Sequence, residues 1–300
     1  MPNPFDLLES DVVARLKAIP LLARMPMEGS VSGHHKSPHR GSSVEFAEYR
    51  NYVPGDDIRR LDWRVFARTD RFYLKEFEAE TNLRCHLVVD GSGSMAFAGE
   101  GRPKFEVVQR IAACLAHLTI QQGDAAGLNI SHSKDAFEAP AKRTPSHVSL
   151  ILEALSKASP SGETMLTETL TELAEKIRRR ALVVIISDLF CDTKALLSCC
   201  QHLRFKKHDV AVFHVLDPQE ISFEFDRPIR FQDMESSFSL VSEPAMIRDA
   251  YLKEFHQYLE QVRGGCMELN VDYRRVITNE PYESAIAGFL RDRAQSMGPL

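Results

Sequence analysis

The strongest constraint on the fold is a continuous apolar run at residues 182–186, which reads Leu-Val-Val-Ile-Ile. A strand with one face in water alternates apolar and polar side chains, and this run shows no such alternation. It is typical of a strand that is covered on both faces, as the strands of parallel sheets are. The sequence therefore predicts a sheet with helices packed on each side.

Short apolar runs alternate with helical patterns from about residue 83 onward. Strands are expected at residues 83–89, 125–131, 181–187, 210–216 and 267–273. Helices are expected at residues 103–122, 146–158, 165–180, 193–205, 245–263 and 282–294, the fourth of them capped by Asp192. This order predicts an α/β fold, with a doubly wound, mostly parallel sheet of the Rossmann-like kind and helices on both faces.

The residues before this alternation have a different pattern. An amphipathic helix is expected at residues 5–18, and residues 46–80 are dense in paired charges. Four aspartates face five arginines at residues 56–71, so the charges of this block nearly cancel. We therefore expect an amino-terminal segment at residues 1–80 that packs on the sheet, followed by an α/β domain at residues 81–300.

Charge and apolar content exclude several classes of function. The 37 basic and 42 acidic residues leave a formal net charge of −5, which gives no electrostatic basis for wrapping nucleic acid or coating an anionic membrane. No apolar run approaches the roughly 20 residues of a membrane-spanning helix, and the start does not resemble a signal peptide. Six cysteines without a Cys-x-x-Cys pair favour a reducing compartment. We expect a cytoplasmic protein without nucleic-acid binding or membrane insertion.

A cluster of oxygen-bearing side chains follows the first expected strand. The sequence after residue 89 reads DGSGSM, and its carboxylate, Asp90, is followed by two hydroxyls, Ser92 and Ser94. The glycines between them allow a turn tight enough for the three side chains to converge. Thr164 and Asp188 lie on other loops at the edge of the sheet where ligands bind. Carboxylate and hydroxyl oxygens suit Mg2+, Mn2+ or Ca2+, so the five residues are predicted to form a metal site.

A simpler interpretation gives each of these residues a local role. Asp90 and the two serines would cap the helix behind them, and Thr164 would cap its own helix. Asp188 would begin a turn. Convergence of all five side chains at one edge of the sheet distinguishes the metal site from this alternative.

The pattern Asp-x-Ser-x-Ser, then Thr, then Asp resembles the metal-ion-dependent adhesion site of von Willebrand factor A domains. Asp90 begins the match to its first loop, Thr164 matches the second loop and Asp188 the third. Glu163 stands where many A domains have glycine, which leaves Thr167 as an alternative to Thr164.

Two further stretches narrow the resemblance. Residues 33–38 read GHHKSP, and residues 52–69 read YVPGDDIRRLDWRVFART. They are similar to the signature of the bacterial family called domain of unknown function 58, which carries an A-type domain. The resemblance implies a von Willebrand factor A-like domain at residues 81–300. It also implies a non-enzymatic module in which a partner's Asp or Glu completes the metal. The resemblance further implies a MoxR-type AAA+ ATPase as the partner and a role as an adaptor in protein assembly or maturation.

The charged block around the single tryptophan has two interpretations. It would either dock a partner protein or hold the amino-terminal segment in place through Arg–Asp pairs, which arginine's planar fork favours. The candidate partner-binding residues are Asp56, Asp57, Arg59, Arg60, Asp62, Trp63 and Arg64.

A Mg2+-dependent phosphoester hydrolase that uses Asp90 is the second functional hypothesis. An aspartyl-phosphate enzyme usually has a second acid two residues on, but that position is Ser92, which cannot exchange protons near neutral pH. We expect neither a lysine beside Asp188 nor a histidine at the site, and no Walker sequence occurs. The chain is therefore expected not to be an enzyme.

Overall fold

The computed structural model describes residues 4–24, 45–52, 62–78, 83–99, 101–132, 136–225, 227, 229–235 and 239–295. The chain forms two compact units, one of Met1–Arg24 with Arg84–Leu300 and the other of Met25–Leu83. The boundary near residue 83 lies close to the expected one at residue 80. The first 24 residues, however, belong with the larger unit, whereas we had expected them in a separate amino-terminal segment.

The larger unit contains a six-stranded sheet in the order β10-β7-β6-β3-β4-β5. Its strands are β3 (Arg84–Asp90), β4 (Ala125–Ser131), β5 (Phe137–Lys142), β6 (Leu182–Ser187), β7 (Asp209–Leu216) and β10 (Asp272–Ile277). Every pairing is parallel except that of β5 with β4. All residues of β6 are buried, as its unbroken apolar run predicts. The doubly wound α/β fold is confirmed.

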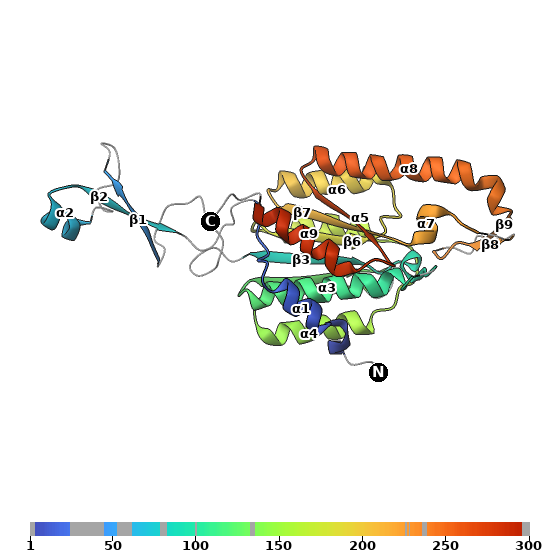
Figure 1. Ribbon diagram of the computed structural model, residues 1–300, viewed down its shortest axis with the longest axis horizontal. Helices are drawn as coiled ribbons and strands as arrows, with labels where there is room; N and C mark the ends of the chain where they lie inside the picture. The colour runs from blue at the N-terminus through green and yellow to red at the C-terminus, as the bar shows by residue number, and fades with distance from the viewer. Residues whose placement is uncertain are drawn as a thin grey trace. The chain divides into compact units, whose positions relative to one another are not determined.

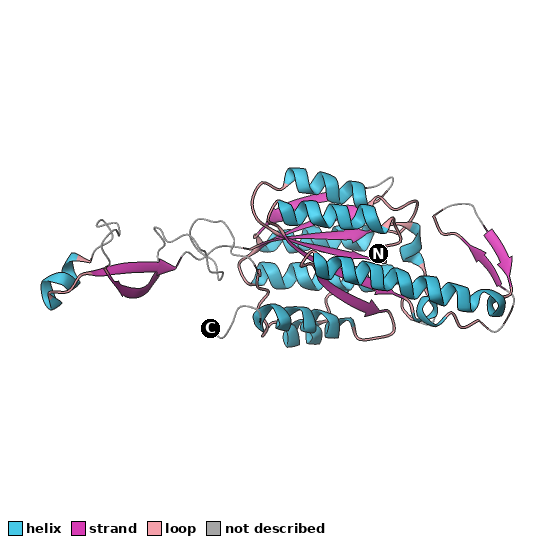
Figure 2. Cartoon of the chain, turned by 90° about the horizontal axis from the view of Figure 1, so that it is seen from above, coloured by secondary structure: helices cyan, strands magenta, loops and turns pink. Residues whose placement is uncertain are grey.

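Helices cover both faces of this sheet (Figures 1 and 2). One face carries α1 (Ser10–Leu16), α3 (Lys104–Gln121), α4 (Pro145–Lys157) and α9 (Tyr282–Gln295). The other carries α5 (Leu166–Lys176), α6 (Thr193–Phe205) and α8 (Pro244–Glu268). Asp192 caps α6, as expected, by accepting a hydrogen bond from the Ala195 amide at 2.7 Å. Within the described residues, each helix is too short or too polar to span a bilayer.

Shorter elements lie around the carboxyl edge of the sheet. A 3-10 turn at Gly93–Ala96 follows β3, and α7 (Pro218–Ser222) follows β7. An antiparallel hairpin of β8 (Ile229–Gln232) and β9 (Ser239–Ser242) connects α7 to α8. The tight turn after β3 was predicted from the sequence, whereas α7, the β8–β9 hairpin and the edge strand β5 were not.

The last predicted strand, at residues 267–273, was wrong. The α8 helix continues to Glu268, and β10 begins only at Asp272. The apolar residues that suggested a strand lie in two different elements: Met267 is in the last turn of α8 and is 65% exposed, whereas Val271 is buried just before β10. Asn270, with φ of 53°, turns the chain from the helix into the edge strand.

The smaller unit pairs two antiparallel strands, β1 (Glu45–Asn51) and β2 (Tyr73–Glu78), with the short helix α2 (Trp63–Thr69). Asp62 caps α2 by accepting from the Arg64 amide at 2.9 Å. Phe66 stacks on Phe72 with ring centroids 4.4 Å apart, whereas Trp63 is 59% exposed. Four candidate partner-binding residues lie outside the described residues: Asp56, Asp57, Arg59 and Arg60.

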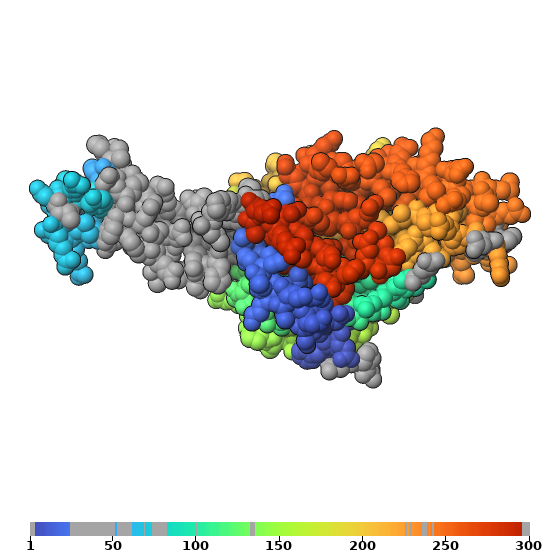
Figure 3. Space-filling model, in the orientation of Figure 1, coloured from blue at the N-terminus to red at the C-terminus, as the bar shows by residue number. Residues whose placement is uncertain are grey.

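A buried arginine joins the two ends of the larger unit. Arg293 of α9 is fully buried and donates to Asp209 Oδ2 at 2.7 Å, at the start of β7. It also lies 3.5 Å from Asp272 Oδ2, at the start of β10, and it donates to the Leu22 carbonyl. Arg24 contributes its amide to Asp209 at 2.8 Å. Figure 3 shows the amino-terminal residues (blue) in contact with α9 (red).

Replacing Arg293 by Met should lower the free energy of unfolding by about 3 kcal/mol, because it removes the buried cation that Asp209 and Asp272 share and leaves them only the more exposed Arg204 and Arg24. Chemical denaturation measures the change. Arg291→Met, at an exposed position of the same helix, is the matched control and should change stability by less than about 0.5 kcal/mol. Equal effects of the two substitutions would show that the buried network does not stabilise the fold.

Candidate metal centre

Three loops meet at the carboxyl edge of the sheet. The loop after β3 is tied to the loop before α5 by two backbone hydrogen bonds: Gly93 N donates to Gly162 O at 2.8 Å and Ser161 N to Gly91 O at 2.9 Å. A Cβ on Gly91 would lie 2.9 Å from the Ser131 carbonyl, so the close approach requires glycine. The third loop follows β6, which lies beside β3 in the sheet.

Asp90 is the centre of the hydrogen bonds in this cluster. Its Oδ1 accepts from the Ser92 amide at 3.0 Å, and its Oδ2 accepts from the Ser187 hydroxyl at 2.6 Å. The Thr164 hydroxyl donates to the same Oδ2 at 3.4 Å. The alternative residue, Thr167, donates its hydroxyl to Glu168. Thr164, rather than Thr167, therefore faces the carboxylate of Asp90.

The hydroxyls of this cluster do not cap helices. Ser92 precedes the 3-10 turn, but its side chain makes no capping hydrogen bond, and its hydroxyl lies 3.1 Å from that of Ser94. The residue at the N-cap of α5 is Met165, not Thr164. The simpler interpretation is therefore wrong for Ser92 and Thr164 as caps. It is confirmed for Asp188, which begins a turn by accepting from the Phe190 amide at 3.2 Å, and Asp90 also makes a local bond to the Ser92 amide.

Asp188 was expected to bind a metal ion, but its carboxylate pairs with a lysine. Lys104, the first residue of α3, is buried and donates to Asp188 Oδ2 at 2.7 Å and to Glu220 Oε1 at 2.6 Å. Burial alone would lower the pKa of Lys104, but the two carboxylates outweigh it and raise that pKa. The expectation that no lysine lies beside Asp188 was wrong. The two residues are 84 positions apart in the sequence, which gave no signal of the contact.

Two histidines lie around the site. His214 Nε2 is 2.9 Å from the Asp188 carbonyl and Nδ1 is 2.9 Å from the Tyr273 hydroxyl. Burial lowers the pKa of His214 to about 4, so the ring is neutral and positions the backbone of the Asp188 loop. His132 lies 2.9 Å from the Ser161 hydroxyl, beside the first loop. The expectation of no histidine at the site was therefore also wrong.

The electrostatics of the cluster favour a cation. Asp90 is buried, and its hydrogen-bond donors within the described structure are all uncharged. Burial, followed by the negative charge of Asp188, raises the pKa of Asp90 to about 6. The carboxylate is thus ionised at pH 7 at a free-energy cost that a bound cation would offset.

The donor set fits a hard, oxygen-preferring divalent ion rather than zinc, which favours nitrogen and sulfur ligands. Asp90, Ser92, Ser94 and Thr164 bring carboxylate and hydroxyl oxygens together, as Mg2+, Mn2+ or Ca2+ prefer. Asp188 shares its charge with Lys104, so it suits a role through an intervening water. The described residues contain no group of three or more His, Cys, Asp or Glu side chains that could hold a metal. A metal here therefore depends on the hydroxyls.

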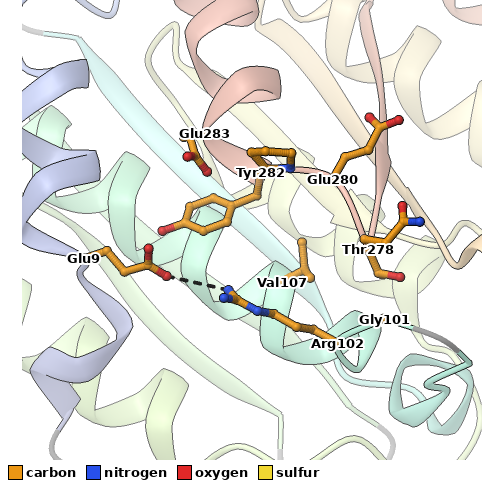
Figure 4. Close-up of a pocket in the computed structure, with 10 residues that line it drawn as sticks. Glu9, Gly101, Arg102, Val107, Thr278, Glu280, Tyr282 and Glu283 are labelled. Atoms are coloured by element: carbon orange, nitrogen blue, oxygen red, sulfur yellow. Dashed lines mark ion pairs between the residues drawn. The ribbon is translucent and has the colours of Figure 1, made fainter.

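Away from this cluster, a hollow of about 530 Å3 lies between α1, α3 and the loop before α9 (Figure 4). Its wall is bridged by ion pairs: Arg102 lies 3.6 Å from Glu9, and Arg15 lies 3.0 Å from Glu283. These pairs connect the amino-terminal residues to α3 and α9. We therefore interpret the hollow as part of the packing interface between α1, α3 and α9.

Replacing Asp90 by Asn removes a buried charge but keeps the shape of the side chain. Its oxygen can still accept from the Ser92 amide, and its NH2 group can donate to the Ser187 and Thr164 hydroxyls, from which the carboxylate accepts. Because the pKa of about 6 in the folded protein exceeds the ordinary 3.8, ionised Asp90 destabilises the metal-free protein by roughly 3 kcal/mol at pH 7. In EDTA, Asp90→Asn should raise the free energy of unfolding by roughly 2–3 kcal/mol. The gain should be complete above pH 6 and vanish below about pH 4, where folded and unfolded chains are both protonated.

Mg2+ should reverse this order, because a ligand that binds only the folded state adds to its stability. It should stabilise the wild type and leave Asp90→Asn unchanged. Urea denaturation at pH 7 in Mg2+ or EDTA measures both effects, with Asp249→Asn on the exposed side of α8 as the control. A wild type whose stability does not respond to Mg2+ would contradict the assignment.

Comparison with known proteins identifies relatives of the chain. The family model described as Protein of unknown function DUF58 matches residues 48–260. An uncharacterized protein of Mycobacterium tuberculosis is 30% identical over 236 residues, which cover 77% of this chain and 73% of that protein.

Two solved structures resemble the chain in part. The hypothetical protein BatB from Bacteroides thetaiotaomicron has a TM-score of 0.47 at 15% identity, over 71% of this chain and 100% of that chain. The SpRpn10 VWA domain has a TM-score of 0.42 at 13% identity, over 73% and 100%. Because both TM-scores are below 0.5, the fold rests on the sheet topology described above. The sequence comparisons identify the family: the chain belongs to the DUF58 family of proteins of unknown function.

Proposed function

We propose that this protein is a metal-dependent protein-binding module without catalytic activity of its own. The observation that carries the proposal is the convergence of Asp90, Ser92, Ser94 and Thr164 at the edge of the sheet where ligands bind. The carboxylate at its centre is buried and receives only neutral hydrogen-bond donors among the described residues. A divalent cation bound there would supply the missing positive charge.

The metal, Mg2+ or alternatively Mn2+ or Ca2+, would keep a coordination position that Asp90 and the hydroxyls of the three loops do not fill. A site with few protein charges keeps affinity for an incoming anionic ligand, so a partner's Asp or Glu fits that position. Phe190, which is 69% exposed and donates its amide to Asp188 Oδ1, would add apolar contact beside it. The chain's own residues thus orient the metal and the rim of the contact.

The proposed partner is a MoxR-type AAA+ ATPase, and the proposed role is that of a cytoplasmic adaptor in protein assembly or maturation. This part of the proposal is supported by the sequence resemblance and by membership of the DUF58 family. It also agrees with the sequence, in which no Walker motif provides for nucleotide hydrolysis by this chain. The exposed Trp63, with Asp62 and Arg64 beside it, remains a candidate for a second contact with the partner.

Partner capture from the native cytosol tests the proposal. Wild-type protein should retain a protein partner in Mg2+ and lose it in EDTA, because the metal forms part of the contact. Asp90→Ala should lose the partner in both conditions, by at least about tenfold, while remaining folded. Asp249→Ala is the surface control and should behave like the wild type. Retention that is identical in Mg2+, in EDTA and in Asp90→Ala would contradict a metal-dependent contact.

A phosphoester hydrolase remains the second candidate, because Lys104 does lie beside Asp188. Its ammonium, however, is held between Asp188 and Glu220 and is not free to steady a phosphoryl group. Ser92 still cannot serve as the proton donor. Steady turnover of p-nitrophenyl phosphate that is lost in Asp90→Ala would support this candidate over the binding module.

A further inference from the structure

The β8–β9 hairpin places part of its connecting loop directly on the candidate metal centre. A Cβ built on Gly93 would lie 2.1 Å from the Met234 carbonyl oxygen, so the two backbones are in direct contact. Gly93 lies between the two serines of the first loop. Figure 1 shows the hairpin at the end of the larger unit where the loop after β3 also lies. The part of the β8–β9 loop at Met234 therefore covers one side of the cluster.

Glu235, the next residue, directs its carboxylate at the second loop of the same centre. Its Oε2 accepts from the Thr164 amide at 3.2 Å, while the Thr164 hydroxyl donates to Asp90. The Glu235 amide donates to Asp233 Oδ1 at 2.9 Å, which fixes the turn that presents the side chain. One threonine thus bridges two carboxylates, one from the sheet edge and one from the hairpin.

The second carboxylate oxygen of Glu235, Oε1, is buried without a partner among the described residues. It is inaccessible to solvent and accepts no hydrogen bond from them. A buried carboxylate oxygen without a partner is costly, by analogy with other buried polar atoms, unless a cation or donor occupies the space it faces. The loop that carries Glu235 contacts Thr164 and Gly93, and both belong to the candidate metal centre.

We propose that Glu235 is a ligand of this centre: the chain's own carboxylate takes the coordination position that a partner's Asp or Glu would otherwise fill. The inference rests on the proposed function, because it requires a metal at Asp90. It gives the binding module a self-liganded resting state. A partner of acidic character must displace Glu235 together with the hairpin loop, so capture is a competition between two carboxylates for one metal position.

Removing the charge of Glu235 tests the competition. Glu235→Gln keeps an oxygen that can accept from the Thr164 amide, so the loop contact survives while the anionic ligand is lost. Glu243→Gln makes the same change at an exposed position at the start of α8, where the side chain makes no capping hydrogen bond, and is the matched control. The probes are Mn2+ and a short peptide with blocked ends and a single Asp.

Calorimetric titration with Mn2+ should show binding that is about tenfold weaker in Glu235→Gln than in the wild type or Glu243→Gln. Titration with the peptide in the presence of saturating Mn2+ should show the reverse order, with at least tenfold tighter binding to Glu235→Gln. The peptide should not bind in EDTA.

The possible failures are distinguishable. If Glu235→Gln binds Mn2+ and the peptide as the wild type does, while Asp90→Ala loses Mn2+, the metal centre stands and Glu235 is not its ligand. If the wild type and Asp90→Ala bind Mn2+ equally, the centre itself is refuted, and Glu235 with it. Circular dichroism of each variant confirms that the fold is retained.

Discussion

A buried, uncompensated carboxylate at the end of a central strand is the constraint on which the site depends. Asp90 lies where β3 leaves the sheet, and its hydrogen bonds come from an amide and two hydroxyls rather than from a cation. The nearby charge of Asp188 makes its ionisation less favourable still. Natural proteins keep such arrangements mainly where function requires them, because an apolar or neutral residue would be more stable there.

The two edges of the sheet differ in whether their buried carboxylates are paired with a cationic side chain. At the amino ends of β7 and β10, Arg293 neutralises Asp209 and Asp272, and the resulting network joins helix α9 to the amino-terminal residues. At the carboxyl ends, Lys104 neutralises Asp188 but not Asp90. The first arrangement has its full complement of opposite charges and holds the fold together, whereas the second leaves a position for a cation from solution.

Much of the fold follows from local sequence patterns, and the rest does not for physical reasons. The buried strand β6 and the cap of α6 are set by apolar runs and by Asp192, and both were predicted. Strand β10 was misplaced because an edge strand that is only partly buried carries a weak apolar pattern. Three site residues were missed because they join the site only through tertiary contacts. Lys104 contacts Asp188, Ser187 contacts Asp90, and Glu235 contacts Thr164. Sequence spacing carries no record of such contacts.

The most direct test of the account is a crystal structure of the full chain grown in Mn2+, with an anomalous difference map at the manganese edge. The account predicts a peak in contact with Asp90 and with the hydroxyls of Ser92 and Ser94, which lie 3.1 Å apart. It also predicts Glu235 within coordinating distance of that peak. A map without manganese beside Asp90, at a concentration that saturates ordinary Mg2+ sites, would contradict the central claim.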